Sequence, residues 1–295
     1  MKPPPFGYVA PSTVGEALAV MNDGAHDEPR LIAGGQSLVP LLNMRVSRPT
    51  VLVDLNGIDD LRGLDWADGY LRIGAMTRQR VLETDAGVRD RIPLLTEAAG
   101  LIAHVAIRTR GTVGGSLAHA DPAAELPAAM LALGATLLVR GADGSKRAVP
   151  AAEFFVGPFT TAVARGELLE GIEVPVPEAR TGFAFVEMSR VHGAFALAGV
   201  AALVALGPDG VVTRASLALC GVGGAPYAPA WPQELMVGRR LDAATIGDAG
   251  ERVCAEVDPP TDGQASSDYR RRLAGVLTRR ALALARDRAG AMEAA

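Results

Sequence analysis

Gly111-Thr-Val-Gly-Gly-Ser116 is the stretch of sequence that decides the fold, together with another glycine pair in Ala33-Gly-Gly-Gln-Ser37. In chain order, residues 33–37 are the first glycine motif, which follows a predicted strand, and residues 111–116 are the second, which lies between segments 93–103 and 123–133 that we expect to be helical. Successive amides that no Cβ shields can form a concave site for an anion. Two such loops would suit the two phosphates of a dinucleotide, although neither has the Gly-x-Gly-x-x-Gly spacing of a Rossmann site. A plain turn is the alternative interpretation of each glycine pair.

Polar residues follow the longer glycine stretch. Asp121 precedes Pro122 and is expected to cap the helix that comes next. Glu125 would then lie in the first helical turn, where the helix dipole favours an acid. It could equally accept hydrogen bonds from a ribose or an adenine. His119 is expected to be a loop histidine rather than a catalyst.

The rest of the N-terminal part mixes predicted helices and strands. Thr13 and Glu16 fit a capping box that begins a helix. Strands are expected at residues 30–33, 51–55, 70–74, 136–140, 147–149 and 167–177. We place a domain boundary near residue 177, so that residues 1–177 form one domain with subdomains of about 1–55 and 56–177.

Residues 178–295 have a different pattern. Three predicted strands precede two predicted helices, at 183–190, 195–206, 211–220, 245–257 and 267–289. Strands followed by helices indicate an α+β domain with helices on one face of an antiparallel sheet. The arginines at 270–272 are expected to be solvated or to face a partner.

Composition excludes several classes of protein. The 295 residues carry a net charge of -4, which disfavours a nucleic-acid binder. Two cysteines are too few for an iron–sulfur cluster, and the four histidines have no metal-ligand spacing, so no metal is expected. The longest apolar run, 195–206, is shorter than the ~18 residues of a membrane span. Without an apolar signal core at its start, the protein is expected to be cytoplasmic.

The ordered set of motifs resembles the FAD-binding medium subunit of the carbon monoxide dehydrogenase and xanthine dehydrogenase family, the molybdenum hydroxylases. The likeness is strongest over Arg108–Pro127 and runs almost end to end. Further matching stretches are residues 5–11, 33–42, 48–55, 73–77, 153–157 and 166–169.

The resemblance implies a PCMH-type FAD-binding domain of two α+β subdomains, followed by a smaller domain with a three-stranded antiparallel sheet and helices. It implies FAD held without a covalent bond, because the first glycine motif contains no histidine. The two glycine motifs would wrap the pyrophosphate, and Ile102 and Leu169 would lie on the flavin side. The implied FAD contacts are Leu31, Ile32, Ala33, Gly34, Gly35, Gln36, Ser37, Leu38, Ile102, Thr112, Val113, Gly114, Gly115, Ser116, Asp121, Glu125 and Leu169.

The resemblance also implies partners. Related assemblies oxidise substrate at a molybdopterin centre in a large subunit and pass electrons through [2Fe–2S] clusters in a small subunit to FAD. This chain would be the third component, in a dimer of heterotrimers, with no catalytic acid–base pair of its own. A self-sufficient FAD-dependent oxidoreductase is the alternative function. A binding module that takes up no FAD is a further one.

Four positions depart from the family pattern. Ala106 and Thr109 stand where Gln and Asn are common before the second glycine motif. Glu187 lies in a strand that often carries a lysine, and Ala194 replaces the usual acid of a downstream motif. These departures leave the expected phosphate site unchanged and alter the hydrogen-bonding groups on the flavin side.

Overall fold

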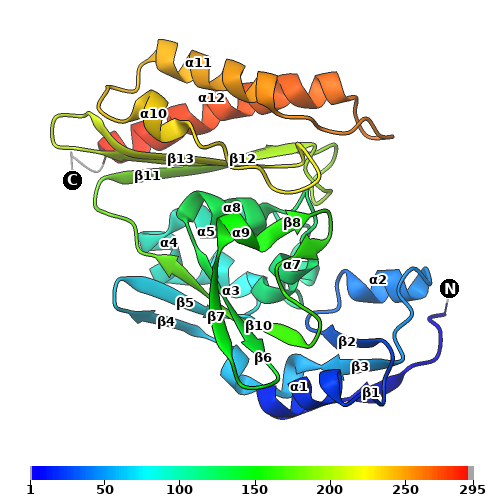
Figure 1. The fold of residues 1–295 in the computed structure, drawn as a ribbon. Helices are drawn as coiled ribbons and strands as arrows, with labels where there is room; N and C mark the ends of the chain where they lie inside the picture. Colours follow the sequence, from blue (N-terminus) through cyan, green and yellow to red (C-terminus); the bar gives the residue numbers. More distant parts are fainter. Residues whose placement is uncertain (1, 292–295) are drawn as a thin grey trace.

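The computed structural model describes residues 2–291 and arranges them around separate sheets (Figure 1). The N-terminal subdomain has a three-stranded parallel sheet in the order β1-β3-β2. Its elements are β1 (Gly7–Val9), α1 (Val14–Asn22), β2 (Pro29–Ile32), α2 (Leu38–Asn43) and β3 (Val51–Asp54). Two short 3-10 turns, Leu55–Gly57 and Asp59–Leu61, lead onward to the next sheet.

The predicted capping box begins α1. The Thr13 hydroxyl accepts from the Glu16 amide at 3.2 Å, as expected. The Glu16 carboxylate reaches one residue further back than a standard box, to the Ser12 amide at 2.8 Å. These bonds satisfy free amides at the start of the helix and fix where the chain enters it.

The second subdomain is a five-stranded antiparallel sheet covered by helices. The strand order is β4-β5-β10-β6-β7. The strands are β4 (Leu64–Ala67), β5 (Tyr70–Gly74), β6 (Thr136–Gly141), β7 (Lys146–Pro150) and β10 (Glu167–Pro175). The helices are α3 (Gln79–Thr84), α4 (Ala86–Arg91), α5 (Pro93–Leu101), α6 (Val105–Arg108), α7 (Val113–His119), α8 (Glu125–Leu133) and α9 (Ala151–Phe154). A small hairpin, β8 (Phe155–Gly157) and β9 (Thr160–Thr161), follows α9.

The C-terminal part is a three-stranded antiparallel sheet between two layers of helix (Figure 1). Its strands are β11 (Thr181–Met188), β12 (Ala198–Leu206) and β13 (Val212–Cys220), and its helices are α10 (Pro232–Met236), α11 (Ala243–Glu256) and α12 (Ser267–Ala291). Helices α11 and α12 cover one face, and α5 and α8 of the preceding subdomain cover the other. Because both faces are covered, every residue of β12 is buried, which explains its continuous apolar sequence.

Glu97 of α5 fastens the C-terminal sheet to the preceding subdomain. Its carboxylate accepts from the Phe185 amide of edge strand β11 at 2.9 Å. The same carboxylate lies 2.7 Å from Arg288 of α12. An amide on a sheet edge and a helix of the outer layer are thereby tied to one acid.

The structure confirms the predicted α+β class and corrects several local expectations. The second glycine motif lies in helix α7 rather than in a loop. Strand β12 begins at Ala198, after an exposed Phe195. Arg270 is buried rather than solvated: it donates to the Leu197 carbonyl at 2.7 Å and binds Asp262 at 2.9 Å.

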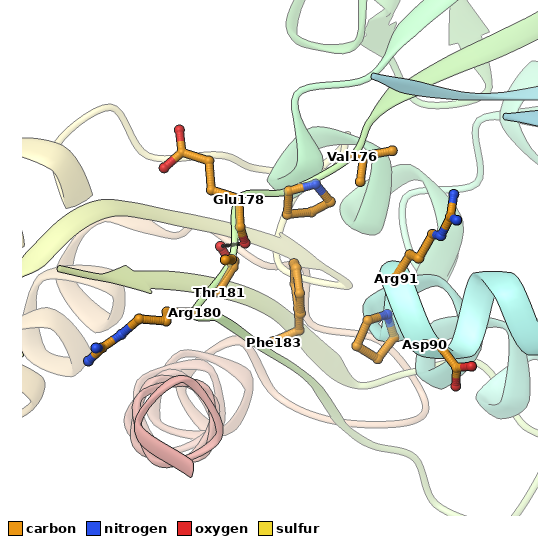
Figure 2. Close-up of a pocket in the computed structure, with 10 residues that line it drawn as sticks. Asp90, Arg91, Val176, Glu178, Arg180, Thr181 and Phe183 are labelled. Atoms are coloured by element: carbon orange, nitrogen blue, oxygen red, sulfur yellow. Dashed lines mark hydrogen bonds between the residues drawn. The ribbon is translucent and has the colours of Figure 1, made fainter. Parts of the chain in front are cut away.

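A pocket of about 190 Å³ lies where the chain passes from β10 to β11 (Figure 2). The Phe183 ring forms part of its wall, and the Thr181 hydroxyl donates to the Glu178 carbonyl at 2.7 Å. None of the predicted FAD-contacting residues lines this pocket. The candidate site is therefore elsewhere, at the glycine motifs.

Candidate functional site

The first glycine motif forms the turn between β2 and α2. Gly35 has a φ of +74°, a conformation that favours glycine. The Val39 amide donates to the Gly35 carbonyl at 2.9 Å, which closes the turn. Within residues 2–291, the amides of residues 34–38 donate to no protein group. A row of unpartnered amides around a glycine turn is suited to a pyrophosphate, so the residues present fit the expected cofactor.

The second motif has no such row of free amides. Thr112 is the N-cap of α7, and its hydroxyl accepts from the Gly115 amide at 3.0 Å. The Val113 amide donates to the Thr77 carbonyl and the Gly114 amide to the Ala75 carbonyl, each at 2.8 Å. The expectation that this motif is a second anion nest is therefore wrong, because the protein itself occupies these amides.

The glycines of the two motifs instead permit close packing. A Cβ on Gly114 would lie 2.5 Å from the Ala75 Cβ, so glycine lets α7 approach the end of β5. A Cβ on Gly34 would collide with the Arg110 carbonyl. A Cβ on Gly115 would lie 3.4 Å from the Ala33 Cβ. The structure thus brings the two predicted motifs together, with Ala33 and Gly34 against the start of α7.

Arg78 braces both motifs and was missed by the sequence reasoning. Its guanidinium donates to the Asn56 side-chain oxygen at 2.6 Å and also to the Arg110 carbonyl. Asn56 in turn donates to the Ala33 carbonyl at 2.9 Å. Burial, followed by the charges of Arg62 and Arg110, lowers the pKa of Arg78. The only signal in the sequence was that Arg78 directly follows residues 73–77, one of the stretches that resemble the family.

Ile102 and Leu169 belong to one apolar cluster beneath the motifs. Ile102 follows α5, and its carbonyl accepts from the Arg108 guanidinium at 2.7 Å. Arg108 is buried and also binds both oxygens of Glu83, at 2.7 and 2.9 Å. Leu169 lies at a bulge of β10, where its pairing with β6 shifts register. These contacts fix the backbone at both predicted flavin-side positions.

Asp121 does not cap α8. The helix begins at Glu125, with Ala124 as its N-cap. The Asp121 carboxylate instead accepts from the Ala123 amide at 2.9 Å. This bond closes a local turn around Pro122, just before the helix begins. His119 ends α7, and its ring lies 5.1 Å from that of Phe159.

Two acids occupy the junction between α8 and the C-terminal sheet. Glu125 is in the first turn of α8 as predicted, but it is only 6% exposed. Burial, and then the charge of Glu187, raise the pKa of Glu125 to about 8. Burial raises the pKa of Glu187, in β11, to about 7. Cys220 is buried beside them, and burial raises its pKa as well.

Among residues 2–291, no group of three or more His, Cys, Asp or Glu side chains is arranged to hold a metal ion. In the same part of the chain, no helix combines the length and apolar character that crossing a membrane requires.

Two family models match the chain. One is described as the FAD binding domain in molybdopterin dehydrogenase and matches residues 4–177. The other is described as the CO dehydrogenase flavoprotein C-terminal domain and matches residues 183–285. Together they take in both glycine motifs and both acids at the junction.

Individual relatives match along their whole length. Subunit alpha of the 6-hydroxypseudooxynicotine dehydrogenase complex of Paenarthrobacter nicotinovorans is 40% identical over 98% of this chain and 97% of the relative. Caffeine dehydrogenase subunit beta of a Pseudomonas species is 37% identical over the same shares. A solved structure of carbon monoxide dehydrogenase from Hydrogenophaga pseudoflava has a chain with a TM-score of 0.94, 35% identity and coverage of 98% of this chain and 99% of that one.

The family models and the relatives agree with the fold and with the free amides of the first glycine motif. The chain therefore belongs to the family of FAD-binding flavoprotein subunits of molybdopterin dehydrogenases, which are oxidoreductases.

Proposed function

We propose that this protein is the FAD-carrying electron-transfer subunit of a heteromeric molybdenum hydroxylase. It receives electrons from [2Fe–2S] clusters of a small partner subunit and passes them to an external acceptor, while a large molybdopterin-binding subunit oxidises the substrate. The observation that carries the proposal is the row of free amides at residues 34–38, in a chain that matches such subunits end to end. Bound FAD supplies the chemistry, because it can accept electrons singly and release them as a pair.

The residues of the chain would bind and orient the cofactor. The amides of residues 34–38 would hold the pyrophosphate, and Arg78 would keep that turn against α7. Residues 31–33 and 112–116 would flank the cofactor, and Asp121 and Glu125 would contact it from the chain that follows α7. Ile102 and Leu169 would exclude water on the flavin side, because both are buried in one apolar cluster.

The assembly we propose is a dimer of heterotrimers in the cytoplasm. Its support is that relatives of the same length are named as a subunit alpha, a subunit beta or a medium chain. We also propose two domains, residues 1–177 and 178–295, with subdomains of about 1–55 and 56–177. The separate sheets of these segments support that division.

Affinity purification of the tagged full chain from its native host tests this function. Two co-purifying polypeptides, together with molybdenum, iron and flavin in the eluate, are the expected result. A chain that elutes alone and turns over a substrate by itself would instead support the self-sufficient oxidoreductase. A colourless chain without partners would support a binding module.

A further inference from the structure

Glu125 and Glu187 come from the two sides of the junction between the FAD-binding domain and the C-terminal sheet, where the Gly221 amide just after β13 donates to the Pro122 carbonyl at 2.8 Å. In the sheet, Glu187 of β11 is opposite Gly199 of β12, which is opposite Cys220 of β13. A Cβ on Gly199 would lie 2.7 Å from the Cys220 sulfur and 3.4 Å from the Glu187 Cβ. Because Gly199 has no side chain, the side chains of Glu187 and Cys220 can approach each other across β12. Cys220 belongs to the core that α8 shares, and α8 begins with Glu125.

Neither carboxyl group has a compensating cation of its own. Within the described residues, Oε2 of Glu187 is buried without a hydrogen-bond partner. Glu125 is only 6% exposed, and it forms no ion pair with another described residue. Arg108 is the cation that acts on Glu125, but its guanidinium is bound to Glu83, a carboxylate that it shares with Arg80. Asp121 adds a further negative charge nearby.

Two carboxylates that share a buried site cannot both ionise cheaply, so the pair retains a proton that separate surface acids would lose. The raised pKa values of Glu125, about 8, and Glu187, about 7, agree with that geometry. The Cys220 thiol contributes no charge, because burial and then the two acids raise its pKa. Near neutral pH one of the two carboxyl groups is therefore protonated, and the other is ionised and can accept a second proton.

The pair lies close to the proposed flavin side. Arg108, which acts on Glu125, also donates to the Ile102 carbonyl at 2.7 Å. The chain after Ile102 meets the loop that follows β11: a Cβ on Gly193 would lie 2.5 Å from the His104 ring. The rings of His104 and His192 are 5.5 Å apart. Arg108 thus connects the surroundings of Glu125 to the backbone of a predicted cofactor contact, Ile102.

We propose that Glu125 and Glu187 act as a proton-holding pair that shares one proton when FAD is oxidised and takes a second from solvent when FAD is reduced. This inference rests on the proposed function. Bound FAD that received two electrons and one proton would keep one negative charge. A proton taken up by the pair would balance that charge, so that two electrons and two protons would enter together. Glu125 and Glu187 are positioning and charge-balancing residues in this scheme.

The first test uses the FAD-free full chain with glutamate labelled by ¹³C at the side-chain carboxyl. Two resonances are expected to titrate above about pH 6, well above an ordinary glutamate. Glu125→Gln and Glu187→Gln should each remove one of them, and Glu187→Gln should lower the pKa of the remaining one because a like charge is gone. Glu173→Gln is the matched control, since Glu173 forms an ion pair with Arg72 on another sheet. If all glutamates titrate in the ordinary acidic range, the pair does not exist.

The second test uses the FAD-loaded chain and follows its midpoint potential with pH between about pH 7 and 8, where the pair holds one proton. The wild type and Glu173→Gln should take up one more proton per two electrons than Glu125→Gln or Glu187→Gln. Equal proton uptake in all four, with FAD bound, would overturn the coupling while leaving FAD binding intact. If the flavin absorption shows no bound FAD in any sample, both the proposed function and the coupling fail. The NMR titration would still report whether the two carboxyl groups share a proton, because it uses the FAD-free chain.

Discussion

At the scale of single residues, the two glycine motifs have different roles although their sequences are similar. The first offers unpartnered amides at residues 34–38, and the second uses its amides to attach α7 to the end of β5. Sequence identified both stretches, because closely spaced glycines mark tight backbone approach. It could not separate the roles, since the partners Thr77 and Ala75 lie far away along the chain and were placed only by the fold.

Arg78→Lys should weaken FAD binding by about tenfold, roughly the value of one charge-assisted hydrogen bond. Lysine keeps the charge but cannot reach both the Asn56 oxygen and the Arg110 carbonyl with a planar fork. Titration of the chain with FAD, followed by flavin fluorescence, measures the change. Arg72→Lys is the control, because Arg72 forms surface ion pairs with Glu173 and Asp68, away from both glycine motifs. Equal affinities in the two variants would argue against a bracing role for Arg78.

Stability should fall as pH rises through the neutral range. In the unfolded chain a glutamate titrates at about pH 4.3, whereas folding raises the pKa of Glu125 to about 8 and of Glu187 to about 7. The folded state therefore binds more protons between these values, and the stabilisation is complete below about pH 4.3 and lost as pH rises toward about 8. Thermal unfolding should show a Tm that declines from about pH 5 to about pH 8, and Glu125→Gln should flatten that decline. A Glu125→Gln profile parallel to the wild type would exclude Glu125 as the cause.

At the scale of elements, periodicity located most strands and helices to within a few residues. It failed where tertiary contacts override local preference. Val113–His119 contains two glycines, which disfavour a helix, yet the Thr112 cap and the packing on Ala75 make it helical. The start of α8 was placed too early, because a proline after an aspartate is typical of a helix start but here belongs to a separate turn.

The buried face of α12 was also misjudged. Arg270 lies on the stripe that continues through Ala274, Leu277 and Ala281, all buried against the sheet. That spacing was available in the sequence, but a run of arginines at 270–272 is typical of a solvated surface. A long aliphatic stem and a bidentate partner, Asp262, allow this one arginine to be buried.

Arg270→Ala should lower the free energy of unfolding by about 2 kcal/mol, because it removes a buried guanidinium and leaves the buried Leu197 carbonyl without this donor. Arg271→Ala should cost less than about 1 kcal/mol, because its ion pair with Asp258 is exposed. Urea unfolding of both variants measures the two values. Similar losses for these neighbouring residues would contradict the buried role of Arg270.

At the scale of the whole molecule, the C-terminal sheet completes the core of the FAD-binding part. Phe183, Phe185 and Cys220 share one apolar cluster with α5 and α8, and Glu97 ties the edge of β11 to α5 (Figure 1). The resemblance of ordered motifs predicted the FAD-binding domain, the smaller sheet-and-helix domain and the cofactor, but it did not predict that α5 and α8 cover one face of the C-terminal sheet. The junction acids were not predicted as a pair, because Glu125 and Glu187 meet only when two separately folded layers come together.

The central claim is that the first glycine motif binds FAD, and retention of FAD by the desalted full chain tests it most directly. Ser37→Asp puts a negative charge beside the free amides at the exposed N-cap of α2, where aspartate is a good capping residue. Ser266→Asp makes the same change at the start of α12, where the Ser266 hydroxyl accepts from the Tyr269 amide. We predict flavin absorption in the wild type and Ser266→Asp, and its loss in Ser37→Asp. Flavin retained equally by all three, or by none, would contradict the account.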